Sequence, residues 1–211
     1  FPSLSGVAGS EDGCPAPSAQ RLLSFISCGL RCIHLSWAAM QTTITRLPRS
    51  VEEDPRGDQV LQLLSANTRP LWSGSEVGAA SVQLTPLLDA ALKNAHHAGQ
   101  IVRGLELAEN RLAREQRGQS ISDKKTGQQR GERVSRLLLL ADDGAERFYR
   151  HVESLLRRHE PRVLAVLLEC DPATLGELLF GPGSLARLLL LEHKEAVSNV
   201  LLSMISKELK D

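Results

Sequence analysis

Two cysteines and a histidine near the start of the chain have the types and close spacing of metal ligands. Cys28 and Cys32 are four residues apart, and His34 follows them. Zinc is held by Cys and His side chains, but a structural zinc site needs four ligands. Because no fourth ligand lies nearby, we predict that these cysteines are buried thiols and that the chain holds no metal.

The other residues whose side chains could take part in catalysis do not form a catalytic pattern. His96 and His97 are adjacent, so on a helix they point in different directions and are predicted to be surface residues. His159 and Glu160 precede Pro161 without an HExxH pattern, which predicts a solvated helix end. Since the chain shows no nucleophile motif or Gly-rich phosphate loop, we predict that it is no enzyme and uses no cofactor.

The charge balance argues against a chain that binds nucleic acid directly. Lys and Arg number 25, and Asp and Glu also number 25, so the formal net charge is zero. Proteins that bind phosphate backbones usually carry a net basic charge. One cluster of cations is predicted to be a solvated linker, with RNA contact or a nuclear signal as the alternative: Lys124, Lys125, Arg130, Arg133 and Arg136.

The cysteines and the N-terminal residues indicate the cellular compartment. Four unevenly spread cysteines are not typical of a secreted disulfide framework, so we expect an intracellular, cytoplasmic protein. Since the first residue is Phe, we also expect a fragment or processed product. Residues 21–47 are apolar but contain Arg31 at their centre, which favours a buried or amphipathic helix over a targeting or membrane-associated segment.

The composition predicts an all-α fold. Aromatic residues make up only 3% of the chain while Leu, Ala, Glu, Arg and Gln are plentiful, which favours helix over sheet. Thr85 and Pro86 predict the start of an amphipathic helix or helix pair. The predicted organisation is a disordered segment 1–20, an apolar helix with Pro-rich loops over 21–80, amphipathic helices over 81–117, a flexible linker 118–133 and a compact domain 134–211.

Residues 134–211 are predicted to form about five short helices. Their expected ranges are 134–140, 145–158, 162–169, 172–180 and 185–209. In the second, Phe148, Val152 and Leu155 recur at helical spacing. Asp142 or Asp143 is expected to cap that helix, and Ser184 the last one; Asp171 and Pro172 are expected to begin the fourth. Short helices joined by Pro/Gly turns predict a compact bundle or superhelix.

The run from Glu146 to Leu185 resembles the MLLE (also called PABC) domain, which closes poly(A)-binding proteins and occurs in a HECT-type ubiquitin ligase. Glu146–Tyr149 (ERFY) is similar to the family's ERLYP or ERLFP opening. Arg162–Glu169 (RVLAVLLE) is similar to its KITGMLLE block, and Ser184-Leu185 to its closing SL. Glu195–Val197 is similar to a later EAV after extra residues, so the resemblance covers about a third of the chain, residues 143–205.

The resemblance implies a peptide-binding site. Tyr149, Ala165 and Val166 would line a pocket for a Phe of the peptide, and Leu168 a pocket for its Leu. Glu146, Arg162 and Glu169 would form the polar rim. The sequence departs from the family pattern because Ala165 replaces its Gly and Val166 its Met, which would narrow the Phe pocket.

We therefore expect a non-catalytic adaptor that binds proteins carrying the linear motif recognised by poly(A)-binding proteins. Those partners would act in mRNA translation or turnover, and RNA would be bound only indirectly. The alternative is a structural protein that forms homo-oligomers through Leu-rich helices, with residues 188–191 filling a groove or forming a dimer surface. Tyr149 distinguishes them, since it would face an open groove in the adaptor and a filled interior in the assembly protein.

Overall fold

The computed structural model describes residues 46–127 and 133–205. The predictions for residues 1–20, for nearly all of 21–47 and for the metal-like residues Cys28, Cys32 and His34 lie outside the described residues. Among the helices that the structure describes, none combines the length and apolar character needed to cross a membrane.

The described chain alternates helices and strands. In chain order, the elements are α2 (Arg49–Glu52), α3 (Gly57–Ala66), β1 (Thr68–Pro70), β2 (Gly78–Val82), α4 (Pro86–His97), β3 (Ile101–Arg103), α5 (Leu105–Thr126), β4 (Arg136–Ala141), α6 (Glu146–His159), β5 (Val163–Leu168), α7 (Pro172–Phe180), β6 (Leu188–Leu191) and α8 (Lys194–Ser203). The prediction of an all-α fold is therefore wrong.

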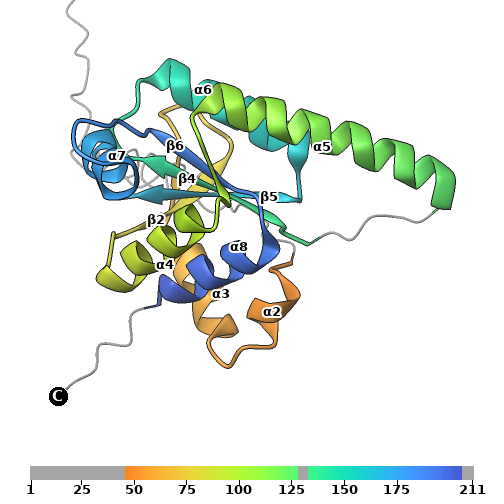
Figure 1. The fold of residues 1–211 in the computed structure, drawn as a ribbon, viewed down its shortest axis with the longest axis horizontal. Helices are drawn as coiled ribbons and strands as arrows, with labels where there is room; N and C mark the ends of the chain where they lie inside the picture. The colour runs from red at the N-terminus through yellow and green to blue at the C-terminus, as the bar shows by residue number, and fades with distance from the viewer. Residues whose placement is uncertain (1–45, 128–132, 206–211) are drawn as a thin grey trace, which may run out of the picture. The chain divides into compact units, whose positions relative to one another are not determined.

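All the described strands join one mixed sheet in the order β1-β2-β5-β4-β6-β3 (Figure 1). The pairs β2/β5 and β5/β4 are parallel, whereas β1/β2, β4/β6 and β6/β3 are antiparallel. In the centre, Arg136 lies opposite Val163 and Ala141 opposite Leu168. This register places the amino ends of β4 and β5 together at one edge of the sheet.

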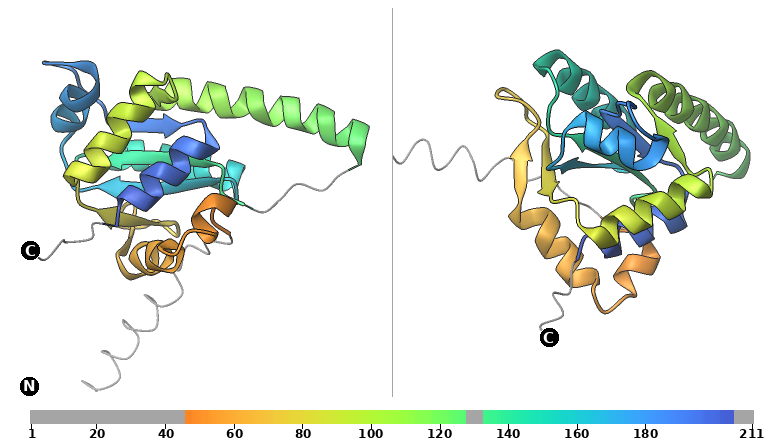
Figure 2. Two further views of the ribbon diagram at one scale, coloured as in Figure 1. Left: turned by 60° about the horizontal axis from the view of Figure 1, so that its bottom comes forward. Right: turned by 60° about the vertical axis from the view of Figure 1, so that its left-hand side comes forward.

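Helices cover both faces of the sheet (Figure 2). Leu137 and Leu139 of β4 pack in a core with residues of α2, α3, α4, α7 and α8. Leu138 and Leu140, which point the other way, pack with residues of α5 and α6. A strand buried on both faces has no polar side, which explains why β4, β5 and β6 are uninterrupted apolar runs.

This two-sided burial is the physical reason for the wrong fold class. The predicted helices 134–140 and 162–169 are the strands β4 and β5, and the predicted helix 185–209 divides into β6 and α8. A short apolar run lacks the periodicity that separates a buried strand from a buried helix. The region 21–80, expected to end in Pro-rich loops, contains β1 and the start of β2.

The predicted domain boundary lies inside the fold. α5 continues to Thr126 through most of the expected linker 118–133. The sheet combines β1, β2 and β3 from one side of that linker with β4, β5 and β6 from the other. Between α4 and α5, Gly99 and Gly104 have positive φ angles of 68° and 92°, so β3 interrupts the predicted helical region 81–117.

The local helix signals were more successful. The Thr85 side chain accepts a hydrogen bond from the Leu88 amide at the start of α4, as predicted. Asp171 caps α7 through the Thr174 amide, with Pro172 in the first turn. The predicted capping of α6 by Asp142 or Asp143 is wrong, because α6 begins after Ala145 without a side-chain cap. The predicted capping of the last helix by Ser184 is also wrong, because the Ser184 hydroxyl donates a hydrogen bond to the Phe180 carbonyl at the end of the preceding helix, α7.

Candidate functional site

Tyr149, the central residue of the expected peptide pocket, is buried in the core between α6 and the sheet. Its hydroxyl donates a 2.8 Å hydrogen bond to the Ala141 carbonyl. Burial is the main cause that raises the pKa of this phenol above its ordinary value. The ring therefore faces a filled interior and not an open groove, which is the outcome expected of the assembly alternative and not of a peptide pocket around Tyr149.

The residues expected to line the rest of that pocket lie within β5. Ala165 packs on the α5/α6 side, while Val166 and Leu168 pack on the opposite side. β5 is paired along its length with β4 and, towards its carboxyl end, with β2. Because all of these side chains are buried and point to two faces, they do not form one pocket.

The three rim residues also lie apart from one another. Glu146 is exposed and pairs with Arg150 one helical turn away at 2.5 Å. Glu169 follows β5 at its carboxyl end and accepts a 3.0 Å hydrogen bond from Ser81. Arg162 precedes β5 at the amino end. Of the predicted site residues, only Arg162 lines the charged hollow described next.

A cleft opens where the amino ends of β4 and β5 meet, with a volume of about 680 Å³. We call it the amino-end cleft. Its lining comes from α2, α5, the start of β4, the residue before β5 and the start of α8: Pro48, Arg49, Ser50, Glu53, Gln119, Ser122, Asp123, Arg133, Val134, Ser135, Arg136, Arg162 and Lys194. Sheet topology explains this convergence, because β6 runs antiparallel to β4 and delivers Lys194 to the same edge.

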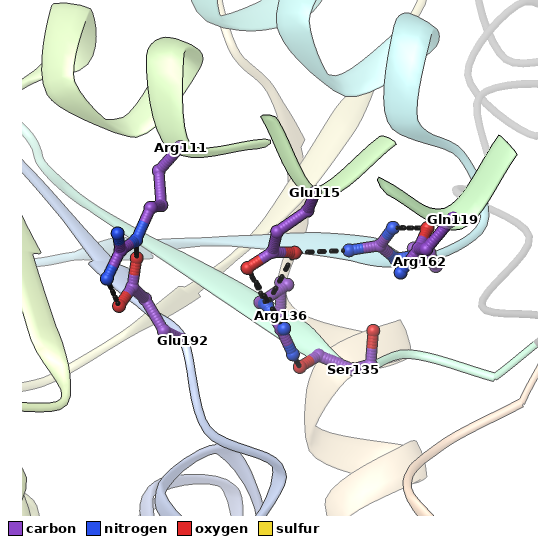
Figure 3. A network of polar contacts seen from close by, with 7 residues as sticks. All are labelled: Arg111, Glu115, Gln119, Ser135, Arg136, Arg162 and Glu192. Atoms are coloured by element: carbon purple, nitrogen blue, oxygen red, sulfur yellow. Dashed lines mark hydrogen bonds and ion pairs between the residues drawn. The ribbon is translucent and has the colours of Figure 1, made fainter. Parts of the chain in front are cut away.

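Two arginines at the base of the cleft hold one carboxylate from α5 (Figure 3). Arg136 donates to Glu115 through Nε at 3.1 Å and Nη2 at 3.0 Å. Arg162 donates to the same carboxylate through Nη2 at 2.6 Å and also bonds to Gln119. The backbone fixes the arginines, since the Ser135 and Arg136 amides both donate to the Arg162 carbonyl.

These charged side chains are largely but not completely buried. The exposed fractions are 17% for Arg136, 13% for Arg162 and 21% for Glu115. Arg162 Nε is buried without a hydrogen-bond partner among the described residues. Charge-assisted hydrogen bonds of this type are stronger than neutral ones, and arginine's planar fork matches a carboxylate. The base of the cleft is therefore built to hold an anionic group.

The rim of the cleft adds further positive charge. Lys194 is exposed and has no ion pair among the described residues. Arg49 pairs with Glu53 at 2.6 Å, and this hydrogen bond raises the pKa of the arginine. Arg133 pairs with Glu52 and donates to the Leu47 carbonyl. The lining contains five Lys or Arg and two Asp or Glu, a difference of five minus two, or +3. Glu52 and Glu115, which pair with Arg133, Arg136 and Arg162, lie outside the lining and offset two of these charges.

A second hollow of about 680 Å³ shares Arg136 and Lys194 with the cleft. We call it the adjacent hollow. It lies between α5 and the start of α8 and is lined by Arg111, Arg114, Glu115, Arg136, Glu192, His193, Lys194 and Glu195. Arg111 and Glu192 close one side with two hydrogen bonds, one of them 3.1 Å long (Figure 3). Glu115 therefore reaches the two cleft arginines from this side.

The opposite, carboxyl edge of the sheet also carries a pocket, of about 630 Å³, next to the ends of β2 and β5. Open α/β sheets commonly bind ligands at this edge. Here Ser81 pairs with Glu169 within the lining, and Arg69 pairs with Asp142 beside it. Nearby Cys170 is half-buried, and burial raises the pKa of its thiol to about 11, which disfavours the nucleophilic thiolate.

The described residues contain no group of three or more His, Cys, Asp or Glu that could hold a metal ion. Arg133 and Arg136 were expected in a solvated linker or RNA contact, and Arg162 in the peptide rim. Arg49, Glu115 and Lys194 were not predicted as site residues, because only the packing of α2, α5 and α8 around the sheet brings them to one edge. No family model matches this chain, and no curated protein matches it.

Proposed function

We propose that this domain is a non-catalytic adaptor that binds an acidic segment of a partner protein in the amino-end cleft. The observation that carries the proposal is the gathering of five Lys or Arg around the cleft, among them the exposed Lys194, in a chain whose net charge is zero. Complementary charge of this kind steers encounter and fixes the orientation of a partner. The adaptor role is that expected from the sequence, with the site moved from β5 to the amino edge.

The polar groups of the cleft suit an extended peptide. Ser50, Gln119 and Ser135 lie among the cations. The Ser50 hydroxyl is bonded to Ser198 and the Gln119 amide oxygen to Arg162, so the Gln119 amide N–H and the Ser135 hydroxyl are the groups offered to a peptide backbone. Arginine side chains can bind the planar carboxylates of Asp and Glu bidentately. A peptide rich in these residues would meet both kinds of group along one surface.

Nucleic acid suits the same lining less well. None of the residues that line the cleft is aromatic, so unpaired bases have no stacking surface there. The expected link to mRNA translation or turnover therefore rests on the partner protein and stays a proposal.

Assembly through Leu-rich helices, the alternative expectation, lacks a surface in the Leu188–Leu191 run that suggested it. This run is the strand β6, which is buried within the described sheet. The adaptor proposal needs no such surface, because its charged groups are exposed at the rim.

The proposal predicts that Lys194→Glu weakens binding of an acidic peptide. The probe is a short fluorescein-labelled peptide of alternating Glu and Ser, titrated into the whole chain and followed by fluorescence anisotropy. We expect saturable binding that weakens at high salt. Lys194→Glu should raise Kd by about tenfold, or ~1.4 kcal/mol, because it replaces an attractive rim charge by a repulsive one.

Arg147→Glu is the matched control. Arg147 is also exposed and in the first turn of a helix, without an ion pair among the described residues, but α6 begins beyond the carboxyl end of β4. A glutamate in a first helical turn is favourable, so neither variant should lose its fold. Equal weakening by both variants, or tighter binding of a single-stranded oligouridylate than of the peptide, would contradict the proposal.

A further inference from the structure

Glu115 holds the position that an anion from outside would be expected to take. Its carboxylate accepts hydrogen bonds from both Arg136 and Arg162, which come from neighbouring strands (Figure 3). Both arginines line the amino-end cleft, whereas Glu115 lines only the adjacent hollow. The arginines are thus approached from the cleft on one side and by Glu115 on the other.

We infer that Glu115 is an internal competitor for the cleft, and that a carboxylate of the bound peptide displaces it from Arg136 and Arg162. This inference rests on the proposed function and names the chemistry of its central contact. The arginines keep an anionic partner in both states, because one carboxylate replaces another. No buried cation is left unpaired by the exchange, which would otherwise oppose it strongly.

The attachment of α5 makes such an exchange feasible. Ala108 and Leu112 in its first half are fully buried against the sheet. From Ala113 to Gly127, none of the side chains whose exposure is described is buried. The second half of α5 is therefore held mainly by polar contacts, including those of Glu115 and Gln119 with Arg162. Segments with few buried apolar contacts open at low free-energy cost.

Glu115 also leaves part of the site unused. It accepts only one hydrogen bond from Arg162, whose Nε has no partner among the described residues. An internal carboxylate competes well in spite of this, because its attachment to α5 gives it a high effective concentration. Removing its charge should therefore favour the external peptide.

The test compares Glu115→Gln with the wild-type chain, using the same Glu/Ser peptide. Glutamine keeps the size of the side chain but removes the competing charge. We expect Kd to fall by about tenfold, the size of effect that one charge pair at such a site produces. Inorganic phosphate serves as a competitor, and if it displaces the peptide at similar concentrations the site recognises any anion, which overturns the assignment of a peptide carboxylate.

Glu109→Gln is the matched control. Glu109 is also on α5, has a side chain exposed to 30% and pairs with an arginine of another element, Arg158, at 2.7 Å. It lines neither the cleft nor the adjacent hollow. This variant should bind the peptide within about twofold of the wild-type chain.

A second measurement needs no variant and so does not depend on the fold of Glu115→Gln. Amide hydrogen exchange of the wild-type chain should become faster over residues 116–123 when the peptide binds, because the release of Glu115 loosens this part of α5. Slower exchange there would mean that the peptide closes α5 onto the cleft, which overturns the inference.

The failure of each proposal gives a different result. If the wild-type chain binds the peptide and Glu115→Gln binds it equally or less tightly, Glu115 is a structural clamp and only the competition is overturned. If neither the wild-type chain nor any variant binds, the proposed function falls and the inference falls with it. Binding by Glu115→Gln alone would support the competition and show that Glu115 blocks the cleft.

Discussion

At the scale of single residues, the buried carboxylate of Glu153 shows how polar groups fasten a loop to the fold. It accepts hydrogen bonds from Trp72 at 2.7 Å, Ser75 at 2.8 Å and Arg157 at 2.7 Å. Burial acts to raise the pKa of Glu153, but these hydrogen bonds outweigh it and hold the pKa below its ordinary value. The loop between β1 and β2 is thereby attached to α6.

We predict that Glu153→Gln lowers the free energy of unfolding by about 1–3 kcal/mol at neutral pH, because it weakens buried hydrogen bonds to a charged acceptor. Glu146→Gln, which removes an exposed pair with Arg150, should change it by less than about 0.5 kcal/mol. Urea unfolding followed by circular dichroism gives both values. Equal effects of the two substitutions would show that Glu153 does not stabilise the loop.

The same carboxylate makes stability depend on pH. Since the folded pKa of Glu153 is lower than its unfolded pKa, its contribution is complete above the unfolded pKa and is lost as pH falls through the folded one. Glu153→Gln should therefore flatten the acid side of the stability profile, below about pH 4.5. An unchanged acid slope in urea titrations would contradict this assignment.

Residue identity predicted local features well and the candidate site poorly. The caps formed by Thr85 and Asp171 were predicted because each depends on a few neighbouring residues. Arg136 and Arg162 meet because of strand register, and Lys194 joins them through the antiparallel course of β6. No local pattern contains that information, so the cleft could not be predicted from spacing.

At the scale of elements, the three apolar strands explain the error in fold class. RLLLLA in β4, VLAVLL in β5 and LLLL in β6 lack alternation because helices cover both of their faces. α6 shows a clear amphipathic pattern, with Val152, Leu155 and Leu156 buried, and it was predicted correctly. Periodicity identifies an element that is buried on one side and fails for one that is buried on both.

The backbone conformation of Gly104 at the start of α5 can be tested by substitution. Gly104 immediately precedes the helix with φ of 92° and ψ of 152°, a conformation that glycine adopts far more readily than other residues, and its amide donates to the Leu188 carbonyl at 2.9 Å. We predict that Gly104→Ala lowers the free energy of unfolding by about 1–3 kcal/mol, measured by urea denaturation.

Gly118, within the same helix, should respond in the opposite way. A Cβ added there meets no atom within 4 Å, and alanine is the better helix former. Gly118→Ala should raise stability by up to about 1 kcal/mol. A loss of stability at Gly118, or none at Gly104, would contradict the described course of α5.

At the scale of the whole molecule, the net charge conceals an uneven distribution. The chain is neutral overall, yet five Lys or Arg and only two Asp or Glu line the amino-end cleft. The sequence total argued against nucleic-acid binding, and it could not indicate a basic site at one edge of the sheet. Segments from α2, α5, β4, β5 and α8 have to come together before that charge exists.

The peptide-binding expectation and the cleft place a ligand at different parts of the same chain. The resemblance to MLLE domains implies contacts around Tyr149 and β5, whose described side chains are buried. The proposal places the contacts at the amino edge of the sheet, near Arg49, Arg136 and Lys194. A method that reports each amide separately can decide between them.

The most direct measurement is an NMR titration of the isotope-labelled chain with the acidic Glu/Ser peptide. We predict that the amide signals of residues 49–50, 133–136, 162 and 194 shift progressively and saturate, while those of residues 149 and 165–168 stay in place. Saturable shifts confined to residues 149 and 165–168, or no shifts in a folded chain, would contradict the amino-end cleft as the binding site.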